Sequence, residues 1–201
     1  SKKARMEESN FSANAYDQVY DAPRPEIFFK SLPEKVVHPS DAVGIRADAT
    51  WNVPEPELTL VVNSRKELVG VSIGNDMSSR DIEGENLLYL PQAKMYERAC
   101  AIGPCIVTGT DEAAIRQWTI GVEIIRGGET VFSGETSINN IKRTFDELLE
   151  YLGRSQSFPH GAMLLTGTGV VPGDEFTLAA EDRIRITVSG IGTLENPVAV
   201  V

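Results

Sequence analysis

The sequence is poor in the residues that bind transition metals. It contains two histidines and two cysteines in 201 residues. His38 and His160 are isolated from each other and from the cysteines, and Cys100 and Cys105 share the apolar segment ACAIGPCIV. A structural zinc site needs about four such ligands at suitable spacing, so none is expected. We interpret both cysteines as small buried thiols, which fits a reducing cytoplasm.

Long apolar runs and excess positive charge are also missing. No run of about 18 apolar residues is present, and no apolar segment follows a basic start, so neither a membrane span nor a signal peptide is expected. Lysine and arginine number 19 against 29 acidic residues, giving a net charge of −10. Such a surface disfavours nucleic acid and anionic membranes as partners, and it suits a protein that holds a divalent cation.

Several nucleotide-binding and hydrolase motifs are absent. The sequence has no P-loop, no G-x-S-x-G and no HExxH. Residues 167–174 are rich in glycine, but they do not lie between a predicted strand and a predicted helix. A dinucleotide-binding turn requires that position, so a dinucleotide cofactor is not expected.

The composition is that of one globular domain, which we place at residues 1–201. Hydrophobic residues make up 41% and charged residues 24%, enough for one sizeable core. The pattern predicts an α+β fold that is mainly β with few helices, because strands and helices do not alternate regularly. The predicted helices are Lys3–Tyr20 and Ile141–Leu152. The predicted strands are Glu26–Lys30, Gly44–Asp48, Leu58–Val62, Leu68–Gly74, Trp118–Ile125, Thr130–Ser133, Met163–Thr166, Glu175–Ala179, Arg183–Val188 and Thr193–Val201.

Two glutamates stand one residue apart in the segment PEPE, directly before a buried strand. The prolines keep this segment extended, so Glu55 and Glu57 point to the same side. Like charges that converge in a partly buried place repel unless a cation or a shared proton relieves them. The alternative is that both glutamates face water, since E-x-E is a common pattern.

A third carboxylate can reach the same place. Leu58–Val62 and Leu68–Gly74 form a predicted hairpin, which returns Asp76 to the end where Glu55 and Glu57 begin. Three carboxylates make an oxygen-rich site for Mg²⁺, Mn²⁺ or Ca²⁺. Three protein ligands would leave positions open for water or a substrate.

The polar stretch after this hairpin, Asp76–Lys94, lacks a clear period and is predicted to be a loop that carries function. Lys94 could bind a substrate carboxylate or stabilise an enolate, and the alternative is a solvated surface lysine. Arg80 could bind substrate too, or form a salt bridge with Asp81 or Glu83.

Longer motifs resemble a known family. PEPEL, GNDMSSRDIEGENLLYLPQAK, LLTGTG and IGTLENPV are similar to segments of the fumarylacetoacetate hydrolase superfamily, and RPEIFFK and GENLLYLPQAK resemble its sugar-acid dehydratase branch. The resemblance spans about residues 3–198. It implies a catalytic domain built as a mixed β-sheet roll, often a homodimer, and the family's small N-terminal domain has no counterpart in this chain.

The resemblance also implies roles for individual residues. Mg²⁺ or Mn²⁺ would be held by Glu55, Glu57 and Asp76, and Lys94 would contact the substrate and help to carry its negative charge. The positions that match substrate-binding residues of the family are Arg80, Glu83 and Thr168. For proton transfer the first candidate is Glu26 and the second is Glu8, while the alternative for Glu26 is a structural salt bridge to Arg24 or Lys30.

The reaction implied is loss of water from a 2-keto-3-deoxy sugar acid, for example 2-dehydro-3-deoxy-D-arabinonate to 2,5-dioxopentanoate. Hydrolases of the superfamily use a histidine–glutamate pair near the start of the catalytic domain, but this chain has no histidine before His38. That difference favours elimination over hydrolysis. The alternatives are a hydrolase or decarboxylase of acylpyruvates or oxaloacetate, and a non-catalytic binding protein with the same fold.

Overall fold

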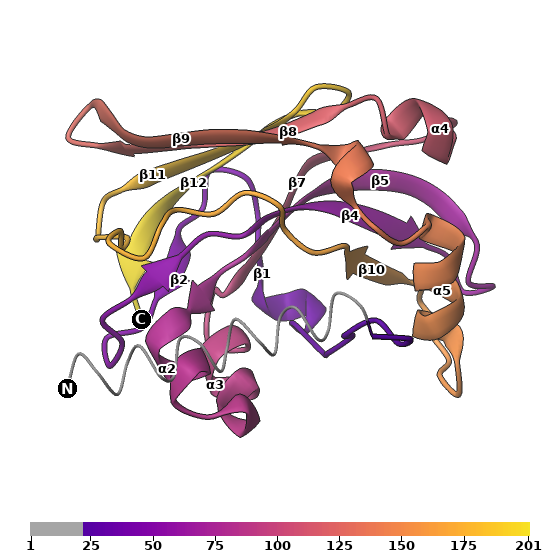
Figure 1. Ribbon diagram of the computed structural model, residues 1–201, viewed down its shortest axis with the longest axis horizontal. Coiled ribbons are helices and arrows are strands. Elements are labelled where there is room, and N and C mark those ends of the chain that lie inside the picture. Colours follow the sequence, from indigo (N-terminus) through magenta and orange to yellow (C-terminus); the bar gives the residue numbers. More distant parts are fainter. Residues whose placement is uncertain (1–21) are drawn as a thin grey trace.

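Two five-stranded sheets packed face to face form the body of the protein (Figure 1). The structure, a computed structural model, describes residues 22–201. The predicted helix Lys3–Tyr20 and the candidate residue Glu8 lie outside the described residues.

The first sheet has the strand order β1-β7-β5-β4-β10. Its strands are β1 (Val36–Val37), β7 (Cys100–Val107), β5 (Leu68–Asp76), β4 (Pro56–Val62) and β10 (Ala162–Leu165). The central pair β4 and β5 is antiparallel, with Glu57 opposite Gly74, so the predicted hairpin is confirmed. Most residues of β4 are buried, as expected of a strand covered on both faces.

The second sheet has the order β2-β12-β11-β8-β9. Its strands are β2 (Val43–Ile45), β12 (Gly192–Val200), β11 (Arg183–Val188), β8 (Thr119–Arg126) and β9 (Glu129–Ser137). Buried and more exposed residues alternate along β8, β11 and β12, because one face of this sheet packs on the first sheet. A short ladder joins β3 (Asn52–Val53) to β6 (Ser78–Ser79).

The hydrophobic core lies between the two sheets. Leu58, Leu60 and Ile73 from the first sheet are at most 1% exposed. They belong to one cluster with Ile124, Ile184, Ile186 and Leu194 from the second sheet. The core fixes β4 and β5, whose ends carry the carboxylates described below.

The helices within residues 22–201 are short and lie at the ends of the sheets (Figure 1). They are α2 (Arg80–Glu85), α3 (Leu90–Lys94), α4 (Glu112–Ile115) and α5 (Phe145–Gly153), with 3₁₀ turns at η1 (Pro33–Lys35), η2 (Leu87–Tyr89) and η3 (Ile138–Asn140). Helix α5 begins four residues later than predicted, because the Thr144 hydroxyl caps it by accepting a hydrogen bond from Glu147 N. Within residues 22–201, no helix is both long and apolar enough to span a membrane.

The mainly β fold with few helices is confirmed, but several local predictions are wrong. Residues 25–32 form no strand, because β1 pairs with β7 at that edge of the sheet. Residues 175–179 form no strand either, and Leu178 N makes a single hydrogen bond to Asn52 O. Residues 76–94 contain short helices rather than a plain loop. Cys105 is exposed, whereas Cys100 is buried as predicted.

Candidate active site

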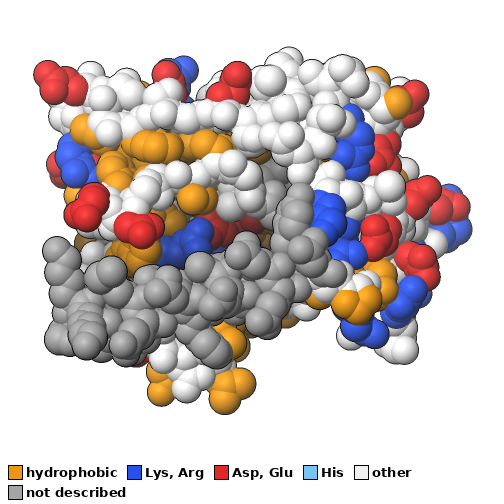
Figure 2. Space-filling model, viewed as in Figure 1, with side chains coloured by type: hydrophobic (Ala, Val, Ile, Leu, Met, Phe, Trp, Pro, Cys, Tyr) orange, Lys and Arg blue, Asp and Glu red, His pale blue; other side chains and the backbone are white. Residues whose placement is uncertain are grey.

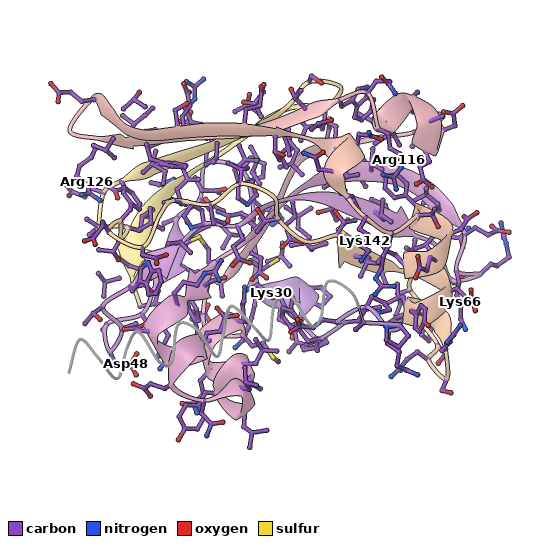
Figure 3. The ribbon with its side chains drawn as sticks, in the orientation of Figure 1. Lys30, Asp48, Lys66, Arg116, Arg126 and Lys142 are labelled. Atoms are coloured by element: carbon purple, nitrogen blue, oxygen red, sulfur yellow. The ribbon has the colours of Figure 1, made fainter. Side chains whose placement is uncertain are left out.

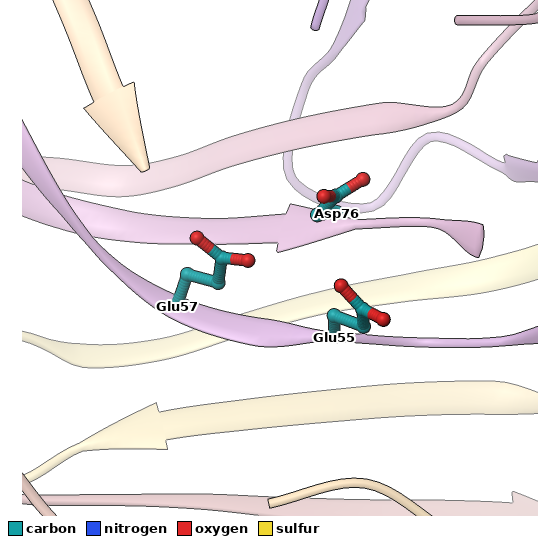
Figure 4. A group of neighbouring side chains, drawn as sticks. All are labelled: Glu55, Glu57 and Asp76. Carbon is teal, nitrogen blue, oxygen red and sulfur yellow. The ribbon is translucent and has the colours of Figure 1, made fainter. Parts of the chain in front are cut away.

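Three carboxylates converge at the ends of β4 and β5 (Figure 4). Glu55 precedes β4, Glu57 is its second residue, and Asp76 is the last residue of β5. Asp76 N donates a hydrogen bond of 2.9 Å to Glu55 O, which fixes the register. One oxygen from each carboxylate lies within 4.8 Å of the others, and the three side chains are buried. The site could therefore hold a metal ion.

Lys94, at the end of α3, points its ammonium group into this carboxylate cluster. Its Nζ lies 2.7 Å from Glu55 Oε2, 3.3 Å from Asp76 Oδ2 and 2.6 Å from Ser78 Oγ. Burial alone would lower the pKa of Lys94, but the charges of Glu55 and Asp76 outweigh it and raise the pKa well above its ordinary value. Lys94 is 4% exposed, so it is not a surface lysine.

Arg80 and Glu83 lie on α2 beside the cluster. An Arg80 guanidinium nitrogen lies 2.7 Å from Glu55 Oε1, and another lies 3.6 Å from Glu83 Oε2. Asp81, considered above as a partner of Arg80, instead accepts hydrogen bonds from the backbone and hydroxyl of Thr50. Burial raises the pKa of Glu55, but Lys94 and Arg80 outweigh it, and the net shift is downward.

Glu57 is less well compensated than the other two carboxylates. Among the described residues, its recorded hydrogen-bond donor is Gly167 N, at 2.6 Å. Burial, with the charges of Asp76 and Glu55, raises the pKa of Glu57 to about 8. Thr168 follows Gly167 in the chain, so the Gly167 contact also brings Thr168 near the cluster. The Thr168 hydroxyl itself donates a hydrogen bond to Val170 O, within the same loop. A buried carboxylate whose charge the neighbouring side chains do not fully match is the kind of ligand that a cation site requires.

Glu26 lies near enough to feel the charges of this cluster. Partial burial and the charges of Glu83, Glu55 and Asp76 raise its pKa, while the charge of Lys94 lowers it. The two salt-bridge partners considered for Glu26 are directed elsewhere. Arg24 lies over the Tyr151 ring, 5.5 Å from its centroid, and Lys30 pairs with Asp76.

Two residues at this site were not predicted to belong to it, although Lys30 was considered as a salt-bridge partner of Glu26. Lys30 pairs with Asp76, and Ser78, which is fully buried, accepts a hydrogen bond from Lys94. Lys30 lies well inside the outline of the molecule, unlike Lys66 and Asp48 at its edge (Figure 3). Acidic and basic side chains lie together in a recess near the centre of this face (Figure 2). Ser78 follows Asp76 by two residues, and that spacing was a signal for Ser78. The sequence around Lys30 gave no such signal, because its partners lie 46 or more residues away.

Comparison with known proteins agrees with this geometry. The chain is 48% identical to a probable 2-keto-3-deoxyxylonate dehydratase of Haloferax volcanii, over all of this chain and 69% of that protein. It is 44% identical to 2-dehydro-3-deoxy-D-arabinonate dehydratase of Saccharolobus solfataricus, over 91% of this chain and 61% of that one. A solved structure of 2-keto-3-deoxy-D-arabinonate dehydratase, in complex with magnesium and 2,5-dioxopentanoate, superposes with a TM-score of 0.89 at 44% identity. The superposition covers 92% of this chain and 66% of the dehydratase chain.

The chain spans between 61% and 69% of the length of these curated relatives. The family model for the C-terminal part of fumarylacetoacetate (FAA) hydrolase matches residues 4–199. The chain therefore belongs to the fumarylacetoacetate hydrolase family.

Proposed function

We propose that this chain carries the catalytic centre of a magnesium-dependent dehydratase. Its substrate is a 2-keto-3-deoxy pentonate, such as 2-dehydro-3-deoxy-D-arabinonate, and its product is 2,5-dioxopentanoate. The observation that carries the proposal is the buried cluster of Glu55, Glu57 and Asp76 with the Lys94 ammonium directed into it. The dehydratases at 44–48% identity support the choice of reaction. The homodimer and the cytoplasmic location stay predictions.

The carboxylate cluster fits a hard divalent cation. All three ligands are oxygens, which Mg²⁺ and Mn²⁺ prefer, and three protein ligands leave room for a chelating substrate. The raised pKa of Glu57 reflects negative charge that a cation would neutralise. When bound, a magnesium ion would polarise the keto oxygen of a 2-oxo acid as a Lewis acid and make its C3 proton more acidic.

Lys94 acts as a fixed positive charge rather than as a base. Its three ammonium protons have three acceptors within hydrogen-bond range, in Glu55, Asp76 and Ser78. Because the neighbouring carboxylates raise its pKa, it keeps its proton at neutral pH. A cation placed here stabilises negative charge that develops on the substrate as the C3 proton leaves.

Glu26 is the group that we assign to proton transfer. Loss of water requires a base at C3 and an acid that protonates the departing C4 hydroxyl, and one carboxyl group can serve both steps in turn. The unsaturated acid must then lose a proton from C5 and gain one at C3 before its enol becomes the aldehyde. A carboxyl group with a raised pKa is suited to such repeated exchange.

Arg80, Glu83 and Thr168 are assigned to substrate binding. Arg80 and Glu83 lie on α2 at the rim of the carboxylate cluster, and Thr168 follows the glycine that binds Glu57. An arginine beside the cluster favours the carboxylate of the substrate, and a threonine hydroxyl can donate a hydrogen bond to that carboxylate.

The test is a turnover assay on the metal-loaded protein with 2-dehydro-3-deoxy-D-arabinonate, following formation of the aldehyde. We expect turnover that EDTA abolishes and that Mg²⁺ restores. Lys94→Met should lower kcat by about a hundred- to a thousandfold, since it removes a preorganised charge. Cleavage of an acylpyruvate or oxaloacetate by a protein that leaves the sugar acid unchanged would refute the proposal.

A further inference from the structure

The segment at residues 25–32 crosses the site without belonging to a helix or strand. It carries Glu26, yet within the described chain no backbone hydrogen bond is recorded for residues 25–31. At its start, the Tyr151 hydroxyl donates a hydrogen bond of 2.8 Å to Pro23 O, which ties the chain to α5. At its end, Lys30 provides the second attachment.

Lys30 makes three polar contacts from one ammonium group. Its Nζ pairs with Asp76 Oδ1, donates a hydrogen bond of 2.9 Å to Met77 O, and donates another to Lys94 O. The side chain is 11% exposed. The ammonium group thus makes one ion pair, at the end of β5, and two hydrogen bonds, one to the residue after β5 and one to the end of α3.

These contacts join the parts of the proposed active site to one another. Asp76 belongs to the carboxylate cluster, Lys94 supplies the cation, and Glu26 lies four residues before Lys30 on the same segment. A buried ammonium group held by three partners has few alternative positions. Breaking any of the three contacts would leave a buried polar group without a partner, which costs free energy. Lys30 can therefore hold the segment that carries Glu26 in place beside the cluster.

We infer that Lys30 is a positioning residue, which anchors the Glu26 segment to the end of β5 and to α3. This inference rests on the proposed function for its catalytic part, because it assumes that Glu26 transfers a proton. It differs from a role in charge balance alone, since it predicts a change in the mobility of residues 25–32 and a specific coupling to Glu26.

The first test needs no activity. In Lys30→Met, chymotrypsin should cleave after Phe28 or Phe29 at least about tenfold faster than in the wild type, because the segment opens locally. The matched control is Lys35→Met, at an exposed lysine whose recorded partner Glu97 lies 3.8 Å away, and it should leave the cleavage rate unchanged. Lys30→Gln, which keeps two N–H donors, replaces Lys30→Met if that variant does not fold. Equal cleavage rates in the Lys30 variant and the wild type would overturn the inference.

The second test is a double-mutant cycle on kcat. Lys30→Met should lower kcat by about ten- to a hundredfold and change KM less than about threefold, because positioning of the proton-transfer group is lost. Adding Lys30→Met to Glu26→Gln should lower kcat by no more than about twofold further. Additive losses would show that Lys30 does not act through Glu26 and would overturn that part. A wild type without turnover would instead refute the proposed function, and the cleavage assay would still decide whether Lys30 anchors the segment.

Discussion

Replacing Glu57 by glutamine should stabilise the metal-free protein while it removes metal binding. Glu57 is 4% exposed and lies beside Asp76 and Glu55, and these surroundings disfavour its charged form. Glutamine has nearly the same shape, carries no charge, and can still accept the hydrogen bond from Gly167 N. The charged form of Glu57 is thus needed to bind the cation, but it lowers the stability of the protein when no cation is bound.

The size of the effect follows from the pKa of Glu57. This pKa is raised from 4.5 to about 8 in the folded protein, so the folded state binds a proton more tightly than the unfolded state does. The free energy of unfolding therefore falls as pH rises from about 4.5 towards 8, and by pH 7 the loss is about 3 kcal/mol. Glutamine does not titrate, so the free energy of unfolding of E57Q should not show this loss at neutral pH.

The assay is urea unfolding of EDTA-treated protein at pH 5 and at pH 8. We expect E57Q to exceed the wild type by about 4 kcal/mol at pH 8 and by only about 1 kcal/mol at pH 5. Glu129→Gln, at an exposed glutamate that begins β9, should change neither value. Added Mg²⁺ at a hundred times its Kd should stabilise the wild type alone, by about 2.7 kcal/mol. An E57Q protein that is less stable than the wild type at pH 8 without metal would refute this reasoning.

Three further predictions concern other contacts. Lys94→Met should lower the free energy of unfolding of the metal-free protein by about 3 kcal/mol in urea titrations. The variant removes a buried cation from Glu55 and Asp76, which keep only Arg80 and Lys30 as partners, and an unchanged value would contradict this. One thiol, that of Cys105, should react with DTNB in the native protein, and two should react after unfolding. The reason is that Cys100 is buried and burial raises its pKa to about 12, so two fast-reacting thiols in the native protein would contradict this prediction. Asp182→Ala should lower the unfolding free energy by about 3 kcal/mol, since Asp182 is fully buried and binds Arg126 through two contacts of 2.7 Å; a loss below about 1 kcal/mol would show that the pair is dispensable.

The features that could be predicted from the sequence are those with a strong local signal. The β4–β5 hairpin and β11 have long apolar or alternating patterns, and β11 was placed residue for residue at Arg183–Val188. The prolines of PEPE put Glu55 and Glu57 on one side, and the hairpin brought Asp76 back to them. Local backbone geometry therefore accounts for the carboxylate cluster.

The features that were missed depend on contacts distant in sequence. Residues 26–30 have the composition of a strand, but the sheet edge that they would need is taken by β1. Helices α2 and α3 have six and five residues, too few for a helical period to appear in the sequence. The partners of Lys30 lie 46 or more residues away, so nothing in its local pattern indicates them.

The most direct test of the central claim is the anomalous scattering of Mn²⁺ in a crystal of this protein. We predict one strong peak per chain, about 2.1 Å from an oxygen of each of Glu55, Glu57 and Asp76, the distance that such small divalent cations keep from oxygen ligands. The peak should be absent from crystals of E57Q treated in the same way. A peak elsewhere, or none at this cluster in the wild type, would contradict the account.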